Sequence, residues 1–228
     1  MDKGTLQQIE RGDLVDMVVE QLTRAIVEGR VRPGDQLVEM EVGQQLGVSR
    51  GPVREAIRRL EQMGVVEKIP YRGAFVSVLT SHDVRELHDL REPLEGLAAR
   101  LTAEKKGAEA AAVLGGIVEE MRAANPAADP SIMVSLDAGF HDTLIELSDH
   151  KLLQELWVTI SVRLQTFLLL KQERMYGSPA EAAAIHEPII AAIADGDAER
   201  AEREARRHVR QAARQHVIDW INKFETDA

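Results

Sequence analysis

An aspartate and a histidine four positions apart are placed to hold a metal ion together. Asp137 and His141 lie in a segment with helical spacing, and residues four apart on an α-helix project from the same face. A carboxylate oxygen and an imidazole nitrogen are both ligands of divalent transition metals. One such pair by itself is only a weak indication of a metal site.

Two further histidines are predicted to stand opposite each other. His186 precedes Gly196 by ten residues, and His208 follows it by twelve. If Gly196 marks the turn of an antiparallel helical hairpin, the α-helical rise places these histidines about 15 and about 18 Å from the turn. Their rings could then face each other. The remaining histidines have no such partners and are expected to be surface or capping residues: His82, His88, His150 and His216.

Three arginines at helical spacing could bind nucleic acid. Arg50, Arg54 and Arg58 recur every four residues and therefore share one face of a helix. Guanidinium groups bind guanine edges and phosphate oxygens through paired hydrogen bonds. The formal net charge is −10, but the excess acid lies after residue 80, and residues 50–72 hold six basic and three acidic side chains. A merely solvated charged face is the alternative for such a stripe, so the surrounding elements decide between the two.

The arginines fall in the second helix of a predicted helix-turn-helix. Apolar spacing predicts helices over 13–28 and 39–46 and a third that begins after Ser49 and ends at Gly64. Ser49 is expected to cap that third helix, and Pro52 suits its first turn. A tight connection between two short helices is typical of proteins whose second helix enters the major groove of DNA.

A β-hairpin with a basic tip is predicted to follow. Two β-prone segments span 65–69 and 74–78, with Pro70, Tyr71, Arg72 and Gly73 between them. The segment 30–37 is predicted to be a turn. A helix-turn-helix followed by such a hairpin is a winged helix-turn-helix.

Beyond Thr80 the periodicity is helical throughout. Helices are predicted over 82–103, 108–124, 131–147, 151–172, 179–194 and 197–224. Pro93 and Pro188 fall inside two of them, so each predicts a kink or a shifted helix boundary. The expected fold class is mainly α, with a winged helix-turn-helix DNA-binding domain over 1–80 and an all-helical bundle over 81–228.

Composition excludes several classes of protein. The 228 residues contain no cysteine, so neither disulfides nor thiolate metal sites are available. No run of about 18 apolar residues and no signal-peptide core occurs. We therefore expect a cytoplasmic protein that does not associate with a membrane.

The motifs resemble a family of regulators. The stretch LGVSRGPVREAIRRLEQMGVVEK, followed by YRGAFV, is similar to the DNA-binding domain of the GntR superfamily. The stretches LREPLEGLAARL, LDAGFHDTLIELS and IHEPIIAAIADGDAERAEREARRHV resemble the FCD ligand-binding domain of its FadR-type branch. The resemblance implies a homodimer that binds a roughly palindromic double-stranded DNA operator, with an affinity that a bound effector alters.

The resemblance also assigns residues. DNA contacts are implied for Ser49, Arg50, Arg54, Arg58, Arg72 and Gly73. Two positions depart from the family pattern: Gly51 stands where a hydroxyl residue often follows the arginine, and Met40 where a fatty-acid-responsive relative has an arginine. Asp137, His141, His186 and His208 match the Asp-His-His-His set with which many FCD domains bind a divalent metal, and this ligand set suits Zn, Ni or Mn.

An open coordination position on that metal could accept a small organic acid as effector. Arg91 and Arg163 are candidates for binding a second anionic group of the effector. For Arg91, a salt bridge with Glu95 is an equally good interpretation.

The sequence as a whole predicts a ligand-responsive transcription regulator, with repression relieved by a small carboxylate, and not an enzyme. A metal-dependent enzyme built on the helical bundle is the alternative, but it explains only the C-terminal half, which lacks a general-base motif such as HExxH. A helical adaptor for protein partners explains neither the wing nor the ligand set.

Overall fold

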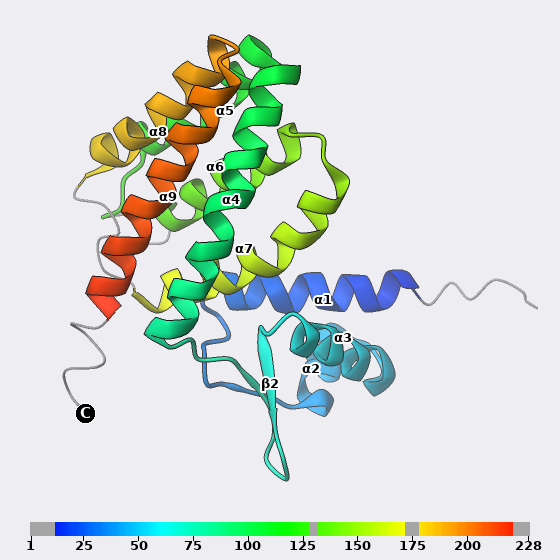
Figure 1. Ribbon diagram of the computed structural model, residues 1–228. Coiled ribbons are helices and arrows are strands. Elements are labelled where there is room, and N and C mark those ends of the chain that lie inside the picture. Colours follow the sequence, from blue (N-terminus) through cyan, green and yellow to red (C-terminus); the bar gives the residue numbers. More distant parts are fainter. Residues whose placement is uncertain (1–11, 128–131, 172–177, 221–228) are drawn as a thin grey trace, which may run out of the picture. The chain divides into compact units, whose positions relative to one another are not determined.

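The computed structural model describes residues 12–127, 132–171 and 178–220. It divides the chain into two compact units, Met1–Val78 and Leu79–Ala228 (Figure 1). In these described ranges no helix combines the length and the apolar content that crossing a bilayer requires.

The first unit contains three helices and a small antiparallel sheet. The helices are α1 (Gly12–Val27), α2 (Glu39–Leu46) and α3 (Arg50–Gln62). The strands β1 (Gln36–Leu37), β2 (Val66–Ile69) and β3 (Gly73–Val76) lie in the order β1-β3-β2. The predicted turn is therefore wrong at Gln36 and Leu37, which pair with Phe75 and Ala74. Two residues are too few to display the alternation by which a strand is predicted.

Helix α3 is amphipathic in the predicted sense. Its buried stripe consists of Val53, Ala56, Ile57 and Leu60, whereas Arg50, Arg54 and Arg58 are exposed. The turn before it is tight. Gly47 has a left-handed φ of 67°, and a Cβ on the buried Gly43 would lie 2.9 Å from the carbonyl oxygen of Val48. These two glycines permit the close approach of α2 and α3.

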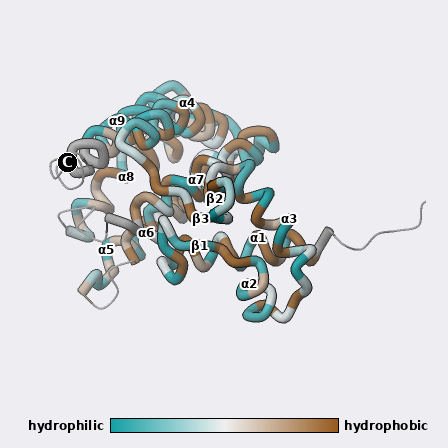
Figure 2. The backbone as a smooth tube through the Cα atoms, turned by 90° about the horizontal axis from the view of Figure 1, so that it is seen from below, coloured by the Kyte–Doolittle hydropathy of each residue, from teal (hydrophilic) through white to brown (hydrophobic). Residues whose placement is uncertain are grey.

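The second unit is a bundle of six helices in its described part. They are α4 (Ser81–Lys105), α5 (Gly107–Ala123), α6 (Ile132–Leu147), α7 (Lys151–Lys171), α8 (Pro179–Ala194) and α9 (Ala198–Trp220). Helix α9 packs along α4, and α5 packs against α8 (Figure 1). Hydrophobic and hydrophilic stretches alternate along these helices (Figure 2), which is the pattern of helices with one face in a shared core.

Local sequence fixes where α4 begins. The Thr80 hydroxyl accepts a hydrogen bond from the backbone N–H of Asp83 at 3.2 Å, and the Asp83 carboxylate accepts one from the backbone N–H of Thr80 at 2.7 Å. This reciprocal capping box satisfies two N–H groups that the helix itself leaves unpaired.

The two internal prolines do not displace a helix boundary. Helix α4 continues through Pro93 and α8 through Pro188, so of the two predicted alternatives the kink is left at both positions. Each proline removes one backbone hydrogen bond. We attribute the continuity to tertiary packing, because α4 is held along α9, and α8 lies between α5 and α9.

Candidate metal centre and DNA-binding surface

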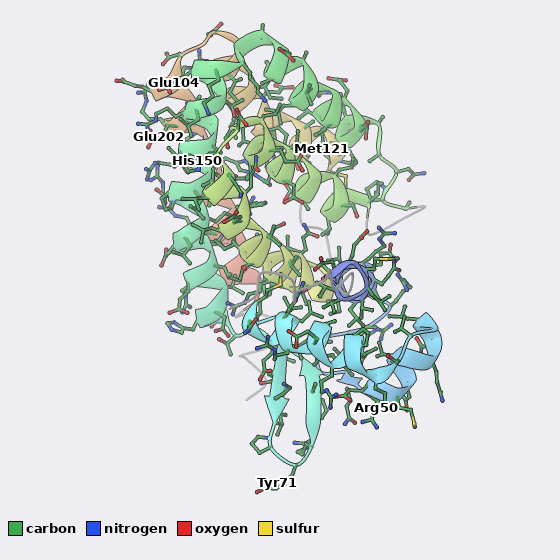
Figure 3. The ribbon with its side chains drawn as sticks, turned by 90° about the vertical axis from the view of Figure 1, so that its right-hand side faces the viewer. Arg50, Tyr71, Glu104, Met121, His150 and Glu202 are labelled. Carbon is green, nitrogen blue, oxygen red and sulfur yellow. The ribbon has the colours of Figure 1, made fainter. Side chains whose placement is uncertain are left out.

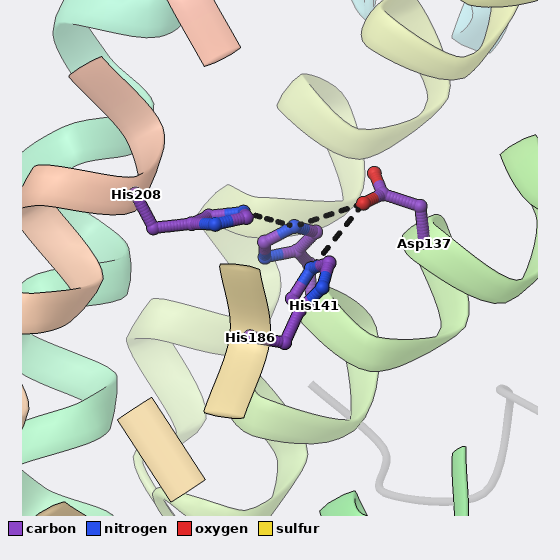
Figure 4. Close-up of side chains that lie close together, drawn as sticks. All are labelled: Asp137, His141, His186 and His208. Carbon is purple, nitrogen blue, oxygen red and sulfur yellow. Dashed lines mark hydrogen bonds and ion pairs between the residues drawn. The ribbon is translucent and has the colours of Figure 1, made fainter. Parts of the chain in front are cut away.

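The bundle brings together four potential metal ligands. Asp137 and His141 come from α6, His186 from α8 and His208 from α9 (Figure 4). One ligand atom from each lies within 4.8 Å of all the others. The four side chains are at most 4% exposed. The arrangement therefore forms a closed polar site inside an apolar bundle, with the buried ring of Phe140 4.4 Å from that of His186, measured between centroids.

Hydrogen bonding directs unprotonated nitrogens into this site. His186 Nδ1 donates to the carbonyl oxygen of Ala182 at 2.7 Å, so the Nε2 of a neutral ring has only a lone pair. That Nε2 lies 3.3 Å from an Asp137 carboxylate oxygen and has no hydrogen-bond partner among the described residues. His208 Nε2 lies 3.3 Å from His141 Nε2. The lone pair of His186 Nε2 and the Asp137 oxygen repel each other at this distance unless a cation lies between them. The His141–His208 contact is a hydrogen bond when one of the two rings carries its proton on Nε2.

The titration properties of Asp137 and His208 favour a cation, whereas Glu95 and Asp137 outweigh burial and raise the pKa of His141 above its ordinary value. Burial alone would raise the pKa of Asp137, but His141 and His186 outweigh it and hold that pKa well below its ordinary value. Burial, together with the neighbouring histidines, lowers the pKa of His208 well below its ordinary value. A carboxylate and a neutral imidazole are the forms that bind metal. The donor set fits a divalent transition metal.

A second layer of buried charge surrounds His141. Glu95 on α4 is fully buried, and its Oε2 lies 2.6 Å from His141 Nδ1. A carboxylate can only accept, so this contact places a proton on Nδ1 and leaves Nε2 free for a metal. Burial would raise the pKa of Glu95, but Arg91 and His141 outweigh it and lower that pKa. Glu95 was not predicted from the sequence as a functional residue.

Arg91 is buried and forms an ion pair with Glu95. The structure thus favours the salt-bridge interpretation of Arg91 over an effector contact. Arg163 on α7 is half-buried, and its Nε is buried without a hydrogen-bond partner among the described residues. Of the two arginines, Arg163 has the capacity left to bind an anion.

The expectation for the other histidines is wrong at one position. His88 is neither a surface nor a capping residue, because α4 buries it to 3% exposure. His82 is exposed, and His150 acts as a cap, since its Nδ1 accepts a hydrogen bond from the backbone N–H of Leu153 at 3.2 Å. The side chain of His216 lies outside the described residues.

We expect His88 to make the protein sensitive to acid. Burial, reinforced by the charge of Arg91, lowers the pKa of His88 from 6.5 to about 3. Between pH 6.5 and pH 3, His88 is protonated in the unfolded chain but not in the folded chain. The free energy of unfolding therefore falls as the pH drops below 6.5, by about 2 kcal/mol at pH 5. In His88→Leu, the free energy of unfolding should fall by that much less between pH 7 and pH 5. Equal losses in the variant and the parent would contradict this, and His82→Leu is the control.

The first unit presents a basic groove. Arg50 and Arg54 on α3, and Lys68 and Tyr71 on the hairpin, line one groove of 670 Å³. Arg50 and Tyr71 lie on the same side of this unit (Figure 3). Arg54 makes no ion pair in the described part of the chain, and Arg50 makes a long one, 3.2 Å, with Glu39. Lys68 pairs with Glu61 at 2.7 Å. A duplex placed against α3 would therefore meet the unpaired charge of Arg54 and the weakly paired charge of Arg50.

The remaining residues predicted to contact DNA differ in whether their polar groups are already bound within the protein. Ser49 occupies the N-cap position of α3, but its side chain makes no capping hydrogen bond, so its hydroxyl and the first N–H groups of the helix are left for another partner. Arg58 is turned toward Glu55, which it binds at 2.7 to 3.2 Å. Arg72 lies over the ring of Phe75 at 5.6 Å, and Gly73 begins β3.

Two family models match the chain. Residues 14–76 match the bacterial regulatory proteins of the gntR family, and residues 86–211 match the FCD domain. The two matches fall within the first and second structural units respectively.

Similar proteins cover nearly the whole chain. A "Probable D-xylose utilization operon transcriptional repressor" of Paenarthrobacter nicotinovorans is 30% identical over 206 residues, which are 90% of each chain. The HTH-type transcriptional repressor RspR of Escherichia coli strain K12 is 27% identical over 89% of this chain and 91% of its own. Among solved structures, E. coli McbR/YncC has a TM-score of 0.76 at 22% identity and covers 92% of this chain and 98% of its own. A GntR regulator from Rhodococcus sp. RHA1 has a TM-score of 0.73 at 25% identity and covers 90% and 97%.

Proposed function

We propose that this chain, which belongs to the GntR family of bacterial regulatory proteins and has an FCD domain, represses transcription until a small organic acid binds. Membership of this family makes it a DNA-binding transcription regulator and not an enzyme. The acid binds in the FCD domain at a divalent metal held by Asp137, His141, His186 and His208. The regulator acts as a homodimer on a palindromic operator, which places one α3 in each half-site.

The basic groove supports the assignment of base-reading residues. Arg50 stands at the exposed N-terminal end of α3, with its side chain 70% exposed, where a guanidinium fork can bind a guanine edge. Arg54 follows one turn later on the same face. Arg58, already paired with Glu55, contributes less. Ser49 and the N-terminus of α3 bind a backbone phosphate, and so does Arg72.

Removing the Arg50 side chain should weaken and relax DNA recognition. We expect Arg50→Ala to lose about 1 to 3 kcal/mol of binding free energy at an operator selected from random-sequence DNA, and less on random DNA. Binding is measured by fluorescence anisotropy at fixed salt concentration. Arg24→Ala, which removes an exposed arginine that pairs with Glu20 on α1, is the matched control. Equal weakening on both DNAs would make Arg50 a phosphate contact.

The metal site supports the response to an organic acid. A bound divalent ion supplies positive charge and an open coordination position for a carboxylate group. Arg163, with its buried unpartnered Nε, binds a second acidic group of the effector through charge-assisted hydrogen bonds. A metal-chelating di- or hydroxycarboxylic acid has both features.

Effector and operator are coupled through the equilibrium between two arrangements of the dimer. The coupling is tested by titrating operator with metal-loaded and with metal-free protein across a panel of such acids. We expect at least one acid of the panel to lower the operator affinity of the metal-loaded protein. The same acid should not change the operator affinity of the metal-free protein. An acid that binds tightly without altering operator affinity would refute the coupling and leave DNA binding standing.

A further inference from the structure

The tip of the β2–β3 hairpin contains a tyrosine in an unfavourable backbone conformation. The backbone N–H of Arg72 donates to the carbonyl oxygen of Ile69 at 3.0 Å, closing a four-residue turn with Pro70 second and Tyr71 third. Tyr71 has φ +62°. Proline followed by a residue of positive φ is the type II pattern, in which glycine or asparagine usually occupies the third position. A tyrosine there imposes backbone strain.

Packing within the protein does not offset this strain. Tyr71 has a relative exposure of 108%, so its ring buries nothing. The other described non-glycine residue of positive φ is Asp149, and aspartate adopts this conformation more readily than an aromatic residue. Strain that is retained without a compensating contact indicates a function for the side chain outside the chain itself.

The rest of the tip is held in place. The Gln36 side chain donates to the carbonyl oxygen of Arg72 at 2.8 Å, and a Cβ on Gly73 would lie 2.7 Å from the same amide nitrogen. The Arg72 guanidinium lies over the ring of Phe75. These contacts hold the backbone of the turn that carries Tyr71 at the end of the hairpin (Figure 3).

That place belongs to the same groove as the arginines of α3. Tyr71 lines the 670 Å³ groove with Arg50, Arg54 and Lys68. A duplex whose major groove holds α3 therefore passes beside the hairpin tip. A tyrosine suits this position, because its ring is apolar and its hydroxyl can donate to an acceptor such as a phosphate oxygen.

We infer that Tyr71 is a DNA-contacting residue whose ring packs on a deoxyribose of the operator and whose hydroxyl donates to a phosphate oxygen. This inference rests on the DNA binding of the first unit and concerns a residue outside the DNA contacts that the family resemblance implies. The ring supplies the larger share of the contact, and the hydroxyl fixes its register along the backbone.

Three substitutions in the full chain separate strain from binding. Tyr71→Gly and Tyr71→Asn remove the ring and relieve the backbone, so we expect an unchanged or higher midpoint of thermal unfolding and an operator affinity about tenfold lower. Tyr71→Phe keeps the ring and the strain, so we expect an unchanged midpoint and an affinity only about threefold lower. Operator binding by anisotropy and scanning calorimetry give the two readouts.

Two outcomes would overturn the inference. If Tyr71→Gly and Tyr71→Asn bind operator as tightly as the parent while Arg50→Ala binds weakly, DNA recognition stands and Tyr71 has no part in it. If both substitutions lower the unfolding midpoint along with the affinity, the ring serves the fold and the loss of binding is indirect.

Discussion

We expect the purified protein to carry about one metal ion per chain and the replacement of His141 or His186 with alanine to remove it. Each histidine supplies one of the four ligand atoms that lie within 4.8 Å of one another. A site that loses one of four ligands no longer offers the ligand number and geometry that divalent transition metals require. Metal analysis of the untagged protein after exposure to Zn, Ni or Mn measures the effect.

Stability should follow the metal. An ion that binds only the folded chain stabilises it by about 4 kcal/mol when its free concentration is 1,000 times the dissociation constant. Chelation should therefore lower the unfolding midpoint of the parent and leave that of His186→Ala unchanged. His82→Ala, at an exposed histidine, should behave as the parent does. Metal retained in both ligand variants, or none bound by the parent at neutral pH, would reduce the four residues to a buried polar cluster.

The sequence predicts individual elements of the metal site better than their assembly. Asp137 and His141 follow from spacing on one helix, and His186 and His208 from their distances to the turn at Gly196. Neither argument places α6 beside the α8–α9 hairpin. That packing depends on contacts between helices distant in sequence, so the resemblance to FCD domains was needed to unite the four residues.

A signal for the second layer was nonetheless present in α4. Buried residues recur there at alternating spacings of four and three: Val84, His88, Arg91, Glu95, Ala98 and Thr102. This is the spacing of a helix face that packs in a core, yet the second, third and fourth members are polar or charged, and the sixth, Thr102, is also polar. Polar side chains in the centre of a core stripe are expensive to bury and indicate a buried polar network. The network follows only from the shared helix face of His88, Arg91 and Glu95, and not from any one of them alone.

In the first unit, by contrast, the assembly of the elements was predictable from the sequence and one local detail was not. The helix-turn-helix and the hairpin were predicted from periodicity and turn residues, and the structure confirms both. Local sequence determines these elements. The conformation of Tyr71 was not predictable in that way. Proline at the second position of the turn favours two turn types, and only the positive φ of the third residue distinguishes them.

We expect the Glu95→Ala substitution to have the largest effect on folding. It breaks the ion pair of the Arg91 guanidinium, which is buried at 1% exposure, and breaking a buried ion pair from one side costs about 3 to 5 kcal/mol. It also removes the group that fixes the tautomer of His141, so metal affinity should fall about 10- to 100-fold. Urea unfolding and competition with a chelator measure the two losses, and Glu86→Ala, at an exposed carboxylate on the same helix, should show neither.

Removing both charges separates the two roles of Glu95. In Arg91→Met with Glu95→Leu, no buried charge is left unpaired, and such apolar replacements of a buried pair are often neutral or stabilising. The double variant should therefore regain most of the free energy of unfolding while its metal affinity stays low, because His141 still lacks its acceptor. Recovery of both properties would mean that Glu95 serves only to neutralise Arg91. If the double variant regains neither the free energy of unfolding nor the metal affinity, the loss in Glu95→Ala comes from packing along α4.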